Sequence, residues 1–195
     1  MKEHIFFTGF MASGKSRTGR AMAERLGRPL VDTDAVIVER AGKSISEIFE
    51  QDGEAKFREM ERNVIAEIAR NETPQVVSLG GGALNNPENV KVIRESGTLI
   101  RLWAKPEILS ERIGRKNTRP LLANLSDEER LAKIKVMLKE REKNYAQADF
   151  SVESTISCTR LISLVVRVTS EDTPILSMSL CERCVIIRKR YKNGF

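Results

Sequence analysis

HIFFTGFMASGKS, residues 4–16, joins a short apolar run to a glycine-rich loop that ends in Gly-Lys-Ser. Its last eight residues, 9–16, fit the pattern G-x-x-x-x-G-K-[ST], and the stretch that follows, SRTGRAMAERLG, is typical of a helix that ends at Gly27. A strand that leads into such a loop, with a helix leaving it, predicts a phosphate-binding site. An ordinary strand-to-helix turn would explain Gly9 and Gly14, but not Gly-Lys-Ser at the start of the helix.

Each part of this loop has a physical role in holding phosphate groups. Gly9 and Gly14 permit backbone turns that aim successive N–H groups at one point, and the helix adds its positive N-terminal end. Lys15 would reach the β- and γ-phosphates, and the Ser16 hydroxyl would bind Mg²⁺. The predicted ligand is therefore a polyphosphate together with its metal ion.

Apolar runs alternate with helical patterns along the rest of the chain. The runs predict buried strands at residues 4–8, 29–32, 75–80, 98–103 and 149–153. Two Ser-x-x-Glu capping boxes, Ser44 with Glu47 and Ser126 with Glu129, mark helix starts. The alternation predicts an α/β fold in one domain, a parallel sheet with helices on both faces.

The composition argues against several classes of protein. The 195 residues suffice for one good core, and 41% hydrophobic with 31% charged residues is typical of a soluble globular chain. There is no apolar run of about 18 residues and no signal peptide, so we expect a cytoplasmic protein without a membrane partner. The net charge of +6 could indicate nucleic acid, but aromatics are only 5% and acidic residues lie between the basic ones. We therefore expect no nucleic-acid partner.

Two aspartates follow the second predicted strand in the sequence VDTD. Asp32 and Asp34 would lie at the carboxyl end of a parallel strand, where open α/β sheets bind ligands. Residues two apart on a strand share a face, so one carboxylate could support Mg²⁺ while the other takes a proton from a hydroxyl acceptor. Either aspartate could instead cap the next helix, but capping requires only one of them.

Two further motifs offer candidate ligands. In EAKFREMERN, Arg58 lies beside an apolar stripe and Glu61 follows three residues later. The two could form a surface ion pair, or Glu61 could orient Arg58 into the cleft. SLGGGAL, residues 78–84, places three glycines after the third strand, where backbone N–H groups could approach an anion or a sugar-like ring.

Arg141 is an anomaly of the predicted helix 127–147. It occupies the same face as Leu131, Ile134, Leu138 and Tyr145, although burying an unpaired charge costs several kcal/mol. Its guanidinium could meet a carboxylate of the core, or it could bind a carboxylate or phosphate of a ligand.

The stretch ERIGRKNTRPLLAN, residues 111–124, is basic and interrupted by Pro120. It resembles a mobile flap that carries Arg112, Arg115, Lys116 and Arg119, one of which could close over a nucleotide and neutralise charge in the transition state. A solvated basic loop is the alternative. From the residues alone we expect a small-molecule kinase whose acceptor is a hydroxylated carboxylate or a similar anion.

Taken together, the motifs resemble those of the shikimate kinase family. The match covers residues 4 to about 168 and rests on GFMASGKS, LVDTD, SISEIFEQDGEAKFREME, SLGGGAL, TRPLL and REKNYAQAD, in the family's order and near its spacing. The resemblance implies a P-loop fold like that of nucleoside monophosphate kinases, with three α/β/α layers and a five-stranded parallel sheet. It also implies a kinase domain over 1–170, with a substrate-binding segment at about 33–62, a lid at about 112–124, and an extension at 171–195.

The resemblance implies phosphorylation of the shikimate 3-hydroxyl by ATP with Mg²⁺, in a monomer. ATP would be bound by Ala12, Ser13, Gly14, Lys15, Ser16, Arg17, Arg112 and Arg119. Ser16 would ligate Mg²⁺ directly and Asp32 through water, and Asp34 would orient or deprotonate the shikimate hydroxyl. Arg58 and Arg141 would clamp the shikimate carboxylate, with a further contact from the Gly81 backbone. Arg119 would close onto the phosphates, and Arg112 would lie against the adenine.

Two other functions remain possible at this point. One is a related kinase for another polyol acid such as gluconate, although the DTD and GGG motifs together argue against it. The other is a nucleotide-binding regulator that exposes its basic tail to nucleic acid, which would leave Asp34 and Arg141 without a role. Ala12 stands where the family often has glycine.

Overall fold

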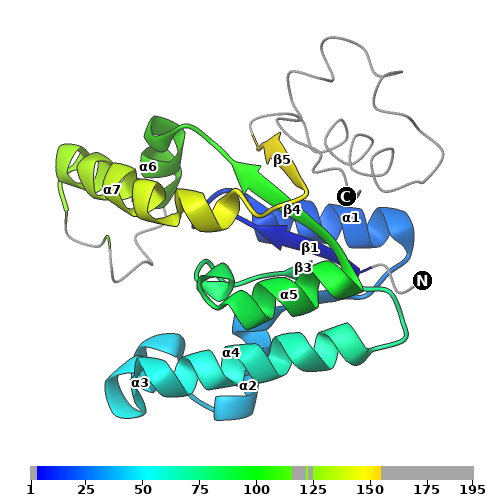
Figure 1. Cartoon of the computed structure of the whole chain (residues 1–195). Coiled ribbons are helices and arrows are strands. Elements are labelled where there is room, and N and C mark those ends of the chain that lie inside the picture. Colours follow the sequence, from blue (N-terminus) through cyan, green and yellow to red (C-terminus); the bar gives the residue numbers. More distant parts are fainter. Residues whose placement is uncertain (1–3, 116–121, 123–124, 155–195) are drawn as a thin grey trace, which may run out of the picture.

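Five parallel strands form a single sheet in the computed structural model of the chain, which describes residues 4–115, 122 and 125–154 (Figure 1). Their order across the sheet is β2-β3-β1-β4-β5. The bounds are β1 His4–Thr8, β2 Leu30–Asp32, β3 Val76–Ser78, β4 Gly97–Trp103 and β5 Phe150–Glu153. The strands predicted from apolar runs are thus all present, and the expectation of a five-stranded parallel sheet is confirmed.

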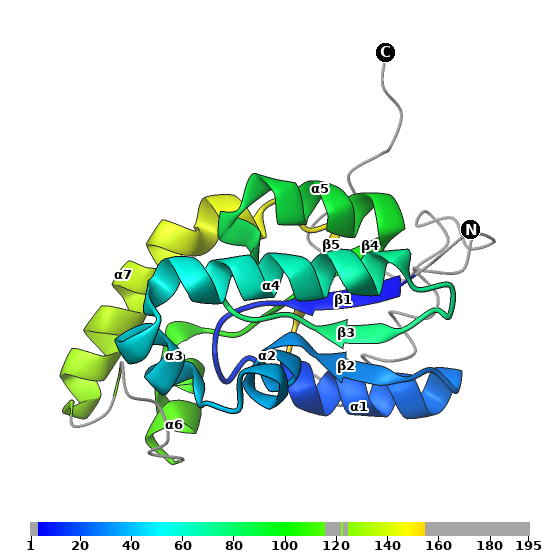
Figure 2. The same cartoon turned by 90° about the horizontal axis from the view of Figure 1, so that it is seen from below.

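Helices lie on both faces of the sheet. They are α1 Lys15–Leu26, α2 Thr33–Ala41, α3 Ile45–Gln51, α4 Gly53–Arg70, α5 Pro87–Ser96, α6 Pro106–Gly114 and α7 Asp127–Tyr145, with a short 3₁₀ helix η1 Ala83–Asn85. Figure 2 shows α4 and α5 on one side of the strands and α1 on the other. The α/β/α layers are therefore those expected.

The alternation of side chains along β1 produces two cores. Phe6 points toward α4 and α5, in a cluster with Val64 and Ile93. Its neighbour Phe7 points to the opposite face and packs with Met22 of α1. Because successive side chains of a strand face opposite ways, a strand buried on both faces is apolar throughout, as HIFFT nearly is.

The predicted helix ends are present. Gly27 ends α1 with φ 62°, the left-handed conformation that glycine adopts without steric cost. Ser44 and Ser126 each form a complete capping box with the glutamate three residues later. Helix α7 ends at Tyr145 rather than at residue 147.

One local prediction about the aspartates needs correction. Strand β2 ends at Asp32 and helix α2 begins at Thr33, so Asp34 lies in the first turn of a helix and not on the strand. The two aspartates were expected to share a face because residues two apart on a strand point the same way, and this reason does not apply to a residue in a helix. Asp32 and Asp34 nevertheless line the same cavity.

Several expectations concern residues outside those described. These are Arg119 with most of the lid at 112–124, and the extension at 171–195. Among the described residues, no helix is long and apolar enough to cross a membrane.

Candidate active site

A cavity of about 820 Å³ opens at the carboxyl ends of β1, β2 and β3. This volume lies within the range of small-molecule sites, and the position is the one where open parallel sheets bind ligands. The cavity brings together most of the predicted site residues, namely Ala12, Gly14, Lys15, Ser16, Arg17, Asp32, Asp34, Arg58, Gly81, Arg112 and Arg141. Ser13 is buried under the loop, where its N–H donates to the Phe10 carbonyl at 3.1 Å.

The loop after β1 has the backbone of an anion-binding turn. Gly9 and Gly14 have φ of 142° and 97°, and Ala12 has φ of 58°. Gly14 is the N-cap of α1 and, because it has no side chain, makes no side-chain cap hydrogen bond to the first turn. The positive end of the helix can therefore stabilise a phosphate at this loop. The Lys15 ammonium folds back over the loop and donates to the Gly9 carbonyl at 2.8 Å.

Ser16 and Asp32 meet beside this loop. The Ser16 hydroxyl donates to Asp32 Oδ2 at 3.4 Å, while Asp32 Oδ1 accepts from the Asp34 N–H at 3.1 Å and caps α2. Asp32 therefore caps the helix, as one alternative predicted, and the same side chain also faces Ser16 and lines the cavity. The oxygen donors fit Mg²⁺, which prefers oxygen ligands and keeps several waters.

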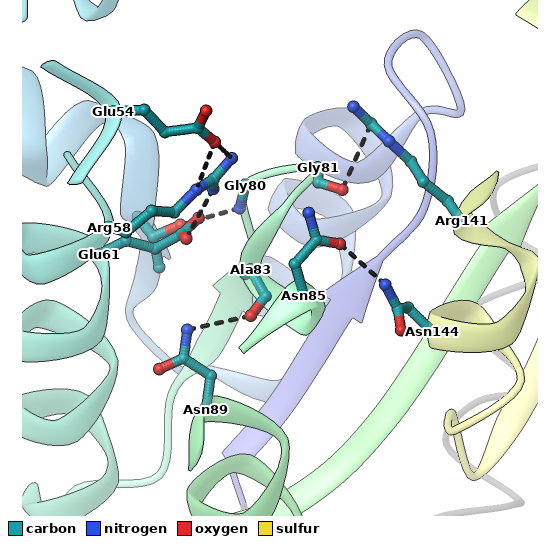
Figure 3. Close-up of polar contacts among 11 residues, drawn as sticks. Glu54, Arg58, Glu61, Gly80, Gly81, Ala83, Asn85, Asn89, Arg141 and Asn144 are labelled. Carbon is teal, nitrogen blue, oxygen red and sulfur yellow. Dashed lines mark hydrogen bonds and ion pairs between the residues drawn. The ribbon is translucent and has the colours of Figure 1, made fainter. Parts of the chain in front are cut away.

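Arg58 lies between two carboxylates of its own helix (Figure 3). Its Nη1 donates to Glu61 Oε2 at 2.9 Å, and its Nε and Nη2 donate to Glu54 Oε1 at 3.2 and 3.0 Å. The Glu61 side chain is only 1% exposed, so the alternative of a surface ion pair with Arg58 is wrong. Glu61 instead holds Arg58 from beneath, at the wall of the cavity.

The charges of this cluster shift its protonation equilibria. Burial raises the pKa of the Glu61 carboxyl, the nearby Arg58 charge opposes that rise, and the Asp34 charge adds to it. Burial alone would lower the pKa of the Arg58 guanidinium, but hydrogen bonds and charges from Glu61 and Glu54 raise it. Arg58 is therefore held as a cation beside the cavity.

The three glycines of SLGGGAL make room for charged side chains. A Cβ on Gly80 would lie 2.5 Å from an Asp34 oxygen and 2.9 Å from a Glu61 oxygen. A Cβ on Gly82 would lie 2.7 and 2.8 Å from the two terminal nitrogens of Arg58, and one on Gly81 would lie 3.2 Å from Arg141. Each glycine thus accommodates a different part of the charged cluster.

Arg141 reaches the cavity from α7, on the opposite side from Arg58 (Figure 3). Its Nη1 donates to the Gly81 carbonyl at 3.4 Å, and its guanidinium lies 5.6 Å from the centre of the Phe10 ring. Arg141 forms no ion pair with any of the described residues, so a partner carboxylate among them does not explain its inward position. The alternative of a ligand anion remains.

Arg112 closes one side of the phosphate loop. Its Nη1 donates to the Ala12 carbonyl at 3.2 Å and to the Ser154 hydroxyl at 3.0 Å. The arginine thereby connects α6, the loop and the residue after β5. Of the predicted nucleotide contacts, Arg119 lies outside the described residues.

Several contacts that shape the site were not found from the sequence. Thr33 Oγ1 accepts from the Gly80 N–H at 3.0 Å and donates to the Ser78 carbonyl at 3.3 Å. Asn144 of α7 donates to the Asn85 side chain at 2.9 Å. These pairs are far apart in sequence and have no local signal, whereas Glu54 could have been found from its i,i+4 spacing to Arg58.

Comparison with known proteins agrees with this architecture. The sequence model of the family described as shikimate kinase matches residues 11–167. A shikimate kinase of Chlorobium limicola is 44% identical over 163 residues, which cover 80% of this chain and 81% of that protein. The crystal structure of shikimate kinase from Bacteroides thetaiotaomicron is 34% identical with a TM-score of 0.77, covering 84% of this chain and 98% of that one.

A third comparison includes a bound molecule. Shikimate kinase from Acinetobacter baumannii, solved in complex with shikimate, is 30% identical with a TM-score of 0.75 and covers 85% of this chain and 92% of that one. The family match includes residues 11–16 of the phosphate loop, the triple glycine and α7, which all contribute to the cavity. This chain belongs to the shikimate kinase family.

Proposed function

We propose that this protein transfers the γ-phosphoryl group of ATP to the 3-hydroxyl of shikimate, giving shikimate 3-phosphate and ADP. The observation that carries the proposal is a single cavity with a phosphate loop at one end and Arg58, Arg141 and Asp34 at the other. A polyphosphate donor and an anionic, hydroxylated acceptor would both find complementary groups there. Membership of the shikimate kinase family supports this choice of acceptor.

At the donor end, the loop from Ala12 to Arg17 binds the ATP phosphates through its backbone N–H groups and the start of α1. Lys15 leaves the carbonyls of Gly9 and Phe10 and donates to the β- and γ-phosphate oxygens. Arg112, already on the Ala12 carbonyl, lies against the nucleotide, and Arg119 closes onto the phosphates from the lid. Phosphoryl transfer depends mainly on such positioning and charge neutralisation.

The metal site consists of Ser16 and Asp32. The Ser16 hydroxyl would bind Mg²⁺ directly, and Asp32 would hold a water of the ion. The two side chains lie side by side, with Ser16 Oγ 3.4 Å from Asp32 Oδ2. When bound, the ion neutralises charge on the transferring phosphates.

At the acceptor end, Arg58 and Arg141 bind the shikimate carboxylate from opposite sides, with a further contact from the Gly81 backbone. Asp34 accepts a hydrogen bond from the acceptor hydroxyl and orients it toward the γ-phosphate. Because the transition state of phosphoryl transfer is loose, the hydroxyl need not be ionised beforehand, and Asp34 takes its proton late.

The remaining parts of the proposal concern organisation. We propose a monomer in the cytoplasm, with residues 1–170 as the kinase domain, a substrate-binding segment at about 33–62, and a lid at about 112–124. Residues 171–195 form an extension beyond that domain.

The test is ADP release in a coupled assay with Mg-ATP, with and without shikimate, and with gluconate in parallel. We expect turnover that requires shikimate and is lost in Lys15→Met, since the substitution removes the ammonium group that would contact the γ-phosphate. Turnover with gluconate in place of shikimate would assign a different acceptor. ATP binding without turnover on either acid would favour a regulator, and a salt-dependent shift on DNA or RNA would support that role.

A further inference from the structure

The side edge of the Arg58 guanidinium is occupied by a carboxylate of its own helix. A guanidinium presents five N–H donors, along a side edge made by Nε with one terminal nitrogen and at the end made by the two terminal nitrogens. The side edge of Arg58 is on Glu54, and Nη1 is on Glu61. Both terminal nitrogens also abut Gly82, at 2.7 and 2.8 Å from the place of a Cβ. A carboxylate that binds this side edge in the bidentate manner must therefore take the place of Glu54.

The three neighbours differ in how easily they can leave. The Glu61 side chain is 1% exposed and belongs to the packed core face of α4, and Gly82 is fixed by its backbone. The Glu54 side chain is 63% exposed, and it comes from the first turn of α4. An exposed carboxylate regains its hydration when it is released, whereas a buried one would be left as an unpaired charge. Glu54 is thus the partner that is easiest to displace.

We propose that Glu54 is an exchangeable carboxylate that occupies the side edge of Arg58 in the empty enzyme and is replaced there by the carboxylate of the substrate. The proposal rests on the function proposed above, since it requires Arg58 to bind the acid. Glu54 then lowers the affinity for shikimate by competing with it for the same two N–H donors.

The opposite role is a support, in which Glu54 holds Arg58 in place for the substrate. The two roles predict opposite changes. If Glu54 competes, its removal strengthens shikimate binding; if it supports, its removal weakens binding. Support for Arg58 is already provided by Glu61 at 2.9 Å, because Glu61 stays beneath the guanidinium when Glu54 moves away.

The test compares Glu54→Gln with the wild type by calorimetric titration with shikimate and by KM in the coupled assay. Glutamine keeps the size and the hydrogen-bonding oxygen but loses the charge, so we expect shikimate to bind about two- to fivefold more tightly, the scale of one exposed ion pair. The KM for ATP should not change. Glu59→Gln is the matched control, since it removes the same charge from the same helix at a residue that pairs with Lys56. Its shikimate affinity should equal that of the wild type.

A second ligand separates exchange from a general change in charge. Shikimate methyl ester lacks the carboxylate, so Glu54→Gln should bind it no better than the wild type does. Weaker or unchanged shikimate binding in Glu54→Gln, or an equal gain in Glu59→Gln, would overturn the role of Glu54 while wild-type turnover leaves the proposed function intact. A wild type that neither binds nor phosphorylates shikimate would overturn both.

Discussion

Gly82 shows how strongly a single missing side chain can constrain a site. Its φ of −108° is accessible to alanine, so the advantage of glycine comes from the Arg58 terminal nitrogens, which lie 2.7 and 2.8 Å from where a Cβ would be. We expect Gly82→Ala to displace Arg58 and to raise the KM for shikimate about tenfold or more, the scale of one charged hydrogen bond. The KM for ATP should not change.

Steady-state kinetics in both substrates checks this expectation. In an Arg58→Ala background the same glycine substitution should add almost nothing, because the side chain that it displaces is no longer there. Full additivity of the two changes would mean that Gly82 acts through some other contact.

Glu61 makes the stability of the folded protein depend on pH. Its folded pKa is raised above the ordinary value of 4.5, chiefly by burial, so above about pH 4.5 the folded state holds a proton that the unfolded state has lost. The stability due to this group is complete below pH 4.5 and is lost as pH rises through the folded pKa. Urea unfolding from pH 4 to 8 should show this decline in the wild type and a smaller one in Glu61→Gln.

Glu47 is the control of opposite sign. Its pKa is lowered by the hydrogen bonds with Ser44 in the capping box, so its contribution is present at neutral pH and is lost as pH falls through the lowered pKa. Glu47→Gln should therefore reduce the loss of stability that the wild type shows as the pH falls. An unchanged slope in Glu61→Gln would mean that the Arg58 charge cancels the effect of burial.

At the scale of elements, the docking of α7 on the segment after β3 aligns the two sides of the cavity. Asn144 donates to the Asn85 side chain at 2.9 Å, one turn along α7 from Arg141, which contacts Gly81 (Figure 3). We expect Asn144→Ala to raise the KM for shikimate about two- to tenfold, since a lost hydrogen bond costs about 0.5–1.5 kcal/mol. Turnover at saturation should change less.

The partner residue supplies the check. Asn85→Ala should have the same effect, and the double variant should be no worse than either single one, because both remove one bond. If the wild type, the two single variants and the double variant all had the same KM, this hydrogen bond would contribute to stability alone.

Across the whole molecule, the sequence predicted what depends on neighbouring residues. The strands, the capping boxes at Ser44 and Ser126, and the loop from Gly9 to Ser16 follow from apolar runs and short motifs, and each is present. Contacts between distant segments were not predictable in this way. The fit of Gly80 to Asp34 and Glu61 depends on how β3, α2 and α4 come together, which no local pattern encodes.

The position of β1 has a consequence for how the protein is made. Although β1 and its loop are synthesised before the other described elements, β1 lies between β3 and β4 and pairs with residues 76–78 and 97–101. Such pairings over long stretches of chain close slowly, because the loop entropy is lost before the contacts form. A nascent chain that ends before β4 therefore carries the complete phosphate motif but lacks the neighbours that hold it in shape, and we expect nucleotide binding only once β4 has been synthesised.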